Sequence, residues 1–194
     1  ELSVQVLQAL IERTGLDPNK IDDFYLGCVG QHLEQGKNLA RLILLLAGLP
    51  DTIPGATVNR LCGSSLSALQ MATDSIKAGN NSQLLVGGVE HLGHVPMIAA
   101  LDYNPRLFDG YDLQWTNMGL TAEKISDEFQ IDRKAQDAFT VKSNKRYFAA
   151  KENGFFTNEI IPVIVSDDQT VTDDQEPRLS TLEKLSELRT VFKE

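Results

Sequence analysis

Residues 56–66 read ATVNRLCGSSL, and this stretch decides the fold. An apolar, extended run ends at about Leu61, and a helix is expected to begin at about Ser64. Gly63 and the serines after it are small enough for a sharp turn between the two elements. A strand that turns directly into a helix is typical of proteins with alternating strands and helices.

Cys62 lies at this turn, where a helix presents unpaired backbone N–H groups and the positive end of its dipole. Both features favour the thiolate, so we expect the pKa of Cys62 to fall from about 8.5 toward neutrality. The small residues that follow leave room for a substrate above the sulfur. The residues alone also allow a buried cysteine that acts as a small apolar side chain.

The chain up to residue 90 alternates between helical and extended patterns. Helices are expected at 3–14, 37–47 and 64–78, and strands at 24–29, 56–61 and 84–86. The apolar strands predict a parallel-rich sheet flanked by helices, an α/β fold. The expected inward faces are Leu39, Leu42, Ile43 and Leu46 on the second helix, and Leu66, Leu69, Thr73 and Ile76 on the third.

The pattern changes after residue 90. We expect an irregular segment at 91–117, helices at 119–129 and 132–153, a strand at 158–165 and an acidic, solvated loop at 167–176. A last helix is expected to open at Ser180, with Glu183 completing a capping box. We therefore divide the chain into an α/β core, 1–90, and an inserted or appended helical loop domain, 91–194.

The composition favours a soluble intracellular domain. The chain has 194 residues, of which 42% are hydrophobic and 23% charged, and a net charge of −9. This charge argues against nucleic acid as the main partner. No apolar run is long enough to span a bilayer, and two cysteines fit a reduced, cytoplasmic protein better than a disulfide scaffold.

Several segments together resemble the thiolase family. They are NRLCGSS at 59–65, GGVEHLGHVPM at 87–97, MGLTAE at 118–123, EQGKNLAR at 34–41 and NEIIPV at 158–163. The resemblance runs in order along essentially the whole chain. It is nearest to degradative 3-ketoacyl-CoA thiolases, the β-subunits of fatty-acid oxidation complexes, and covers the N-terminal half of such a protein.

The resemblance implies a thiolase-like fold and thiolytic acyl transfer in fatty-acid β-oxidation. Cys62 matches the cysteine that accepts the acyl group, and its backbone N–H would contribute to an oxyanion hole. Met118 matches a residue that lines the acyl-CoA pocket, Arg178 a basic residue near the nucleotide, and Phe192 an aromatic residue near the adenine or pantetheine. The loop domain would cover CoA.

The resemblance also implies the partners. Acyl-CoA would be the substrate and CoA the co-substrate, with no metal and no other cofactor. Relatives form homodimers or tetramers and join a hydratase–dehydrogenase α-subunit.

This sequence departs from the family pattern in what it lacks. No Gly-His-Pro motif is present, and Cys28 does not match the second cysteine that moves a proton at the substrate α-carbon. The family's first strand is also missing, so we expect a fragment of a longer polypeptide that is inactive alone. The alternative is a non-catalytic module for CoA binding or assembly. A ketoacyl synthase relative fits the cysteine motif less well.

His91 and His94 are three residues apart and follow Glu90, a spacing that allows a metal site. Since the sequence shows no cluster of further ligands, we interpret both histidines as structural. We likewise interpret Gly87 and Gly88 as positions of tight backbone packing, because no phosphate-binding motif follows them.

Overall fold

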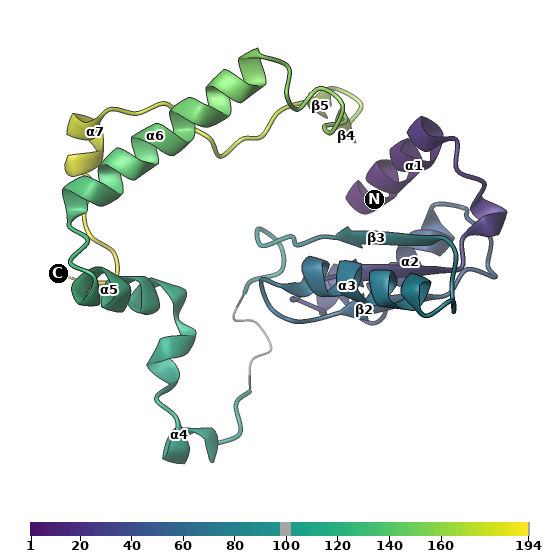
Figure 1. Cartoon of the computed structure of the whole chain (residues 1–194), viewed down its shortest axis with the longest axis horizontal. Coiled ribbons are helices and arrows are strands. Elements are labelled where there is room, and N and C mark those ends of the chain that lie inside the picture. Colours follow the sequence, from purple (N-terminus) through teal and green to yellow (C-terminus); the bar gives the residue numbers. More distant parts are fainter. Residues whose placement is uncertain (98–101, 194) are drawn as a thin grey trace. The chain divides into compact units, whose positions relative to one another are not determined.

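The computed structural model describes residues 1–97 and 102–193 (Figure 1). The chain divides into two compact units, 1–101 and 102–194. The division falls later than the boundary after residue 90 that the sequence predicted. Among the described residues, every helix is too short or too polar to cross a membrane.

The first unit is built on a three-stranded parallel sheet. Strands β1 (Asp23–Gly27), β2 (Gly55–Val58) and β3 (Leu84–Gly88) lie in the order β2-β1-β3, with Phe24 opposite both Gly55 and Leu85. This confirms the α/β class and the parallel sheet. Each strand begins or ends within a few residues of the bounds expected from the sequence.

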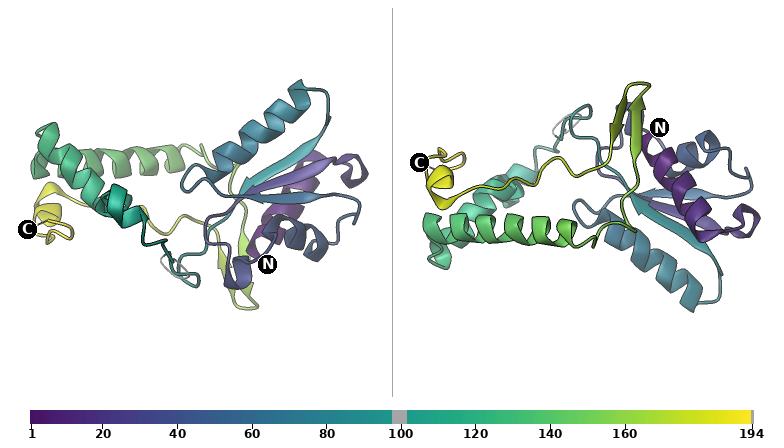
Figure 2. Two further views of the ribbon diagram at one scale, coloured as in Figure 1. Left: turned by 90° about the horizontal axis from the view of Figure 1, so that it is seen from below. Right: turned by 90° about the horizontal axis from the view of Figure 1, so that it is seen from above.

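Helices cover both faces of this sheet. Helices α1 (Leu2–Thr14) and α2 (Leu39–Leu46) lie on one face and α3 (Ser64–Lys77) on the other (Figure 2). The two crossovers, β1 to β2 and β2 to β3, run in opposite directions along the sheet, and right-handed connections then require opposite faces. The short 3-10 helices η1 (Pro18–Lys20) and η2 (Leu33–Gln35) flank β1 in the sequence.

The apolar core of this unit involves α1, α2 and the sheet. Gly15 ends α1 with a φ of 63°, a left-handed conformation that glycine adopts without strain. The buried cluster comprises Val4, Leu7, Ile21, Phe24, Leu26, Cys28, Leu39, Ala40, Ile43, Leu44, Ile53 and Leu85.

The predicted inward face of α3 is wrong. Leu66 is 71% exposed, Leu69 51% and Ile76 48%, and Thr73 is half-buried. The helix instead packs through its small residues Ser64, Ser67, Ala68 and Ala72. Small side chains bring the helix close to the sheet, and the large apolar side chains then point away from it. The predicted inward face of α2 is half right, since Leu39 and Ile43 are buried but Leu42 and Leu46 are exposed. Ala40 and Leu44 are buried in their place.

The second unit is mainly helical. It contains α4 (Leu107–Gly110), η3 (Leu113–Thr116), α5 (Met118–Glu128), α6 (Arg133–Glu152) and α7 (Leu182–Ser186), with a hairpin of β4 (Val163–Ser166) and β5 (Gln169–Val171). Arg133 joins α6 to the end of α7 by donating to the backbone oxygens of Leu185 and Leu188. Such contacts satisfy carbonyls that the end of a helix leaves without partners.

Four expectations for this unit are wrong in part. The strand expected at 158–165 is shorter, because β4 begins only at Val163. The segment 91–117, of which 98–101 lie outside the described residues, is not wholly irregular, because it contains α4 and η3. The acidic stretch 167–176 contains β5, which pairs with β4 because Thr170 and Val171 suit a strand. Helix α7 begins one residue later than predicted, and Thr181, not Ser180, is its N-cap.

Candidate active site

Cys62 lies in the turn between β2 and α3, beyond the carboxyl end of β2. It is exposed, whereas Cys28 is buried, and both thiols are free. The expectation that the helix begins at about Ser64, directly after the turn with Cys62, is confirmed. Gly63 is the N-cap and α3 begins at Ser64, so the thiol precedes the helix rather than lying within it.

The turn that carries Cys62 has a strained backbone. Leu61, the residue before the cysteine, has a φ of 47°, which is uncommon for a residue with a branched side chain. The side chain of Asn59 accepts a hydrogen bond from the Leu61 N–H at 2.9 Å. Strain of this kind persists only where the surroundings impose it, and it gathers at functional sites.

Ser64 holds the other side of this turn. Its hydroxyl accepts from the backbone N–H of Arg60 at 2.9 Å and donates to the carbonyl of Leu61 at 2.6 Å. Ser64 is itself buried against the sheet. The backbone on both sides of Cys62 is therefore fixed, while the thiol remains accessible.

Two glycines of the sheet set how closely α3 approaches. A Cβ atom on Gly27 of β1 would lie 2.4 Å from the backbone nitrogen of Ser65, and one on Gly88 of β3 would lie 1.9 Å from the Ser65 hydroxyl oxygen. This confirms the interpretation of Gly88 as a position of tight packing. The same interpretation of Gly87 is wrong, because a Cβ atom there would make only an ordinary contact of 3.4 Å with Leu26. Because Ser65 closely follows Cys62, these glycines also determine where the thiol lies.

The loops after β1 and β3 meet at the same edge of the sheet as Cys62, since parallel strands place their carboxyl ends together. Glu90 joins these loops. Its carboxylate accepts from the N–H groups of Val29 at 2.8 Å and Gly30 at 3.1 Å, and from the Gln35 amide at 2.7 Å. Desolvation by the neighbouring loops opposes ionisation of this largely exposed residue, but the hydrogen bonds outweigh it and hold the pKa of Glu90 below its usual value.

Replacing Glu90 with alanine is expected to destabilise the protein in a pH-dependent way. A lowered folded pKa means that the carboxylate contributes stability above its ordinary pKa of 4.5, and that this contribution is lost as the pH falls through the lower folded value. The free energy of unfolding at pH 7 should fall by about 1 kcal/mol, a modest figure because Glu90 is exposed. Urea unfolding at pH 7 and near pH 3 measures the difference between parent and variant.

The difference in the free energy of unfolding between the parent and Glu90→Ala should be smaller near pH 3 than at pH 7. Glu12→Ala on the exposed face of α1 serves as the control and should change stability by less than about 0.5 kcal/mol at either pH. A Glu90→Ala effect that is equal at both pH values would contradict the role of the ionised carboxylate.

Cys28 is a core residue. It is 1% exposed, and burial together with the nearby charge of Glu90 raises the pKa of its thiol to about 11. Residues 28–30 carry the letters Cys-Val-Gly, which fit a Cys-x-Gly pattern. A buried thiol with so high a pKa is nevertheless unsuited to exchange protons with a substrate.

The other predicted site residues lie in the second unit. Met118 is the exposed first residue of α5, and the ring of Phe192 lies directly on Gly119, so that a Cβ atom there would overlap it. Lys193 also pairs with Asp127 of α5 at 2.7 Å, which fixes the segment that carries Phe192. Met118 and Phe192 therefore belong to one neighbourhood at the start of α5.

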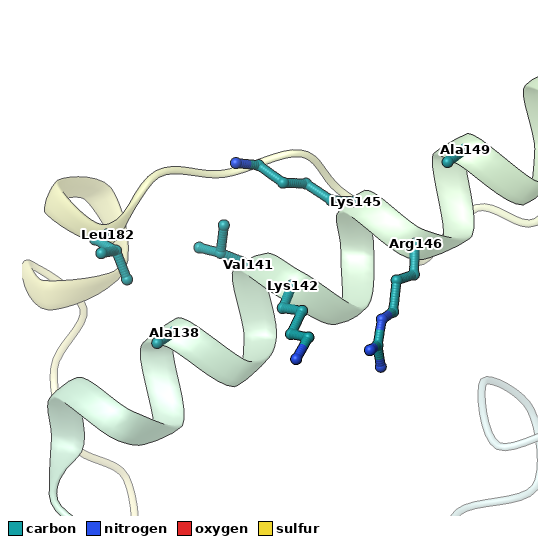
Figure 3. A pocket seen from close by; sticks show the side chains of 7 residues that line it. All are labelled: Ala138, Val141, Lys142, Lys145, Arg146, Ala149 and Leu182. Atoms are coloured by element: carbon teal, nitrogen blue, oxygen red, sulfur yellow. The ribbon is translucent and has the colours of Figure 1, made fainter.

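Arg178 lies elsewhere in this unit. Its backbone N–H donates to the side chain of Asn144, in the middle of α6, at 3.0 Å. The same helix forms a groove of about 450 Å³ with Leu182 of α7 (Figure 3). Three cations, Lys142, Lys145 and Arg146, line this groove beside small apolar side chains. The sequence did not indicate this group of cations, because the chain as a whole carries a net negative charge.

The fold and the turn define a class of protein: an α/β domain with an exposed cysteine on a constrained strand-to-helix turn. Residues 1–194 match the family model "Thiolase, N-terminal domain". The chain belongs to the thiolase family.

Curated relatives carry the name 3-ketoacyl-CoA thiolase. The chain is 43% identical to one from Chromohalobacter salexigens over 98% of its own length and 50% of the relative. It is 43% identical to one from Photobacterium profundum over 99% and 51%, and 47% identical to one from Acinetobacter baumannii over 84% and 42%. The chain therefore spans about half the length of the curated relatives it matches.

Proposed function

We propose that the full-length protein cleaves 3-ketoacyl-CoA with CoA, and that Cys62 accepts the acyl group. The observation that carries this proposal is the exposed thiol on a backbone constrained from both sides. The names of the relatives support the substrate class. Together they point to acyl transfer through a thioester.

In the first step, the Cys62 thiolate attacks the 3-keto carbon of the substrate. The bond between C2 and C3 then breaks, its electron pair passes to C2, and a proton taken up there yields acetyl-CoA. The shortened acyl group remains on Cys62 as a thioester. In the second step, the thiolate of free CoA attacks this carbonyl, the bond to Cys62 breaks, and the enzyme thiolate is restored.

We propose that the backbone N–H of Cys62 stabilises the oxyanion formed in both steps. A Gly-His-Pro motif is absent from these 194 residues. Deprotonation of Cys62 and proton transfer at C2 are therefore assigned to groups elsewhere in the full-length protein. The isolated chain is expected to be inactive.

We propose that the loop domain, 91–194, covers CoA. Met118, at the start of α5, would line the acyl–CoA pocket, Phe192 beside it would contact the adenine or pantetheine, and Arg178 the nucleotide. These contacts require no metal and no organic cofactor besides CoA.

The apolar face of α3 supports the assignment of this chain to a larger protein. Exposed Leu66, Leu69 and Ile76 form a surface that a further part of the polypeptide or a second subunit would cover. We propose a homodimer or tetramer that joins a hydratase–dehydrogenase subunit. A cytoplasmic location fits the two free thiols, one of them exposed.

Alkylation by iodoacetamide tests the nucleophile. At pH 7 we expect Cys62 of the full-length protein to react at least about 100 times faster than Cys28, because Cys28 is buried and a pKa of about 11 leaves about one thiolate in 10⁴. Peptide mass spectrometry after timed quenching measures both rates. An acyl-CoA should slow the labelling of Cys62 and leave that of Cys28 unchanged.

Equal rates of iodoacetamide labelling at Cys62 and Cys28 would show that Cys62 is not the nucleophile. CoA binding without any thiolysis by the full-length protein would favour the alternative, a CoA-binding or assembly module.

A further inference from the structure

Three side chains with metal-binding atoms gather at the edge of the sheet that carries Cys62. One ligand atom from each of Glu34, His91 and His94 lies within 4.8 Å of the other two, and all three residues are exposed. Glu34 belongs to η2, after β1, while His91 and His94 belong to the turn after β3. The cluster therefore joins two loops that are far apart in the sequence.

Hydrogen bonds of one buried side chain, Gln35, hold these two loops together. Gln35, the neighbour of Glu34, is buried, and its side-chain oxygen Oε1 accepts a hydrogen bond from the backbone N–H of His91 at 2.6 Å. Its amide nitrogen donates to the Gly30 carbonyl at 2.9 Å and to Glu90 at 2.7 Å. Because these buried contacts of Gln35 fix the backbones of the loops after β1 and β3, the exposed side chains of Glu34, His91 and His94 are held near one another.

The cluster itself is tightly arranged. The Nδ1 atom of His94 lies 2.6 Å from the Oε1 atom of Glu34. The rings of His91 and His94 meet edge to face with centroids 5.3 Å apart. The Nδ1 atom of His91 accepts a hydrogen bond from the His94 N–H at 3.1 Å, so its lone pair points into the turn.

We propose that Glu34, His91 and His94 form a binding site for a divalent transition-metal ion such as Zn²⁺. Two imidazoles and one carboxylate are a donor set that zinc takes in proteins, with further positions left for water. Two nitrogen donors disfavour Mg²⁺ and Ca²⁺, which prefer oxygen. Metal ligands must be deprotonated, so the ion binds an ionised Glu34 and the bare nitrogen of each imidazole.

A plain ion pair between His94 and Glu34 does not account for the whole arrangement. Exposed ion pairs contribute little stability, and this pair involves only two of the three clustered side chains. A bound ion uses all three side chains and links the loops after β1 and β3. Glu90 is not a ligand, since its oxygens already accept from Val29, Gly30 and Gln35.

Titration with Co²⁺ and Zn²⁺ tests this site. The protein is the full-length polypeptide with Cys62→Ser, so that the exposed thiol does not compete for the metal. We expect Co²⁺ to bind with a visible absorption band and Zn²⁺ to displace it. Glu34→Gln and His94→Gln should each weaken the affinity at least about ten-fold, because each removes one of three ligands.

Glu12→Gln, an exposed carboxylate on α1, is the matched control and should bind as the parent does. Histidine ring nitrogen shifts in NMR spectra of the parent provide a readout that does not depend on any variant. Both His91 and His94 should shift at one equivalent of Zn²⁺. The proposal would be overturned if Zn²⁺ left the ring nitrogen shifts of His91 and His94 unchanged. It would also be overturned if the Glu34→Gln and His94→Gln variants bound the metal as tightly as the control.

Discussion

Cys62→Ser is expected to lower thiolysis of a 3-ketoacyl-CoA by the full-length protein by at least about a thousand-fold. A serine hydroxyl ionises far less readily than a thiol near neutral pH, and the thiolate is the reactive species. Cys62 is exposed and precedes α3, so the substitution should leave the packing of the core intact. The fall should appear in kcat, because the bond to sulfur forms during the chemical steps. Steady-state kinetics with acetoacetyl-CoA measure it.

Cys28→Ala is the matched control for this experiment. It removes a buried thiol, so it is expected to cost some stability through a small cavity but to retain activity within about ten-fold. If Cys62→Ser kept comparable activity, the assignment of the nucleophile would be wrong.

Gly27→Ala is expected to have the largest effect on stability among the substitutions considered. The new Cβ atom would lie 2.4 Å from the backbone nitrogen of Ser65 and 2.7 Å from the carbonyl carbon of Ser64. Backbone atoms cannot rotate away, so α3 must move off the sheet. The loss should be at least about 2 kcal/mol, as for other overpacked positions. Urea unfolding measures this loss.

Gly87→Ala provides a matched control on β3. A Cβ atom there would meet the Leu26 side chain at 3.4 Å, an ordinary contact, and stability should change by less than about 1 kcal/mol. The displaced turn in Gly27→Ala should also slow iodoacetamide labelling or thiolysis at Cys62. Equal stability of the two variants would show that the close approach of α3 does not fix the turn.

Much of the fold could be predicted because strong local signals mark the ends of its elements. Gly15 follows the apolar face of α1 and adopts the left-handed conformation that ends a helix. The alternation of apolar runs with helices led to the parallel sheet. The packing face of α3 could not be predicted, because large apolar residues ordinarily face inward and here Ser64, Ala68 and Ala72 do so. Only the closeness of Gly27 and Gly88 to Ser65 explains that choice.

The site was predictable only in part. The motif around Cys62 identified the turn, but the positive φ of Leu61 and the hydrogen bonds of Ser64 depend on tertiary structure. The interpretation of His91 and His94 as structural rested on the lack of a further ligand in the sequence around them. Glu34 joins them through the pairing of β1 with β3, which no local pattern indicates.

The central claim is that Cys62 carries the acyl group during turnover. The most direct measurement mixes the full-length protein with acetyl-CoA, quenches the mixture in acid within one turnover, and maps the acetyl group by peptide mass spectrometry. We predict an acid-stable acetyl thioester on the peptide that contains Cys62, removed by added CoA. An acetyl group on another residue, or thiolysis that proceeds with Cys62 never acylated, would contradict the account.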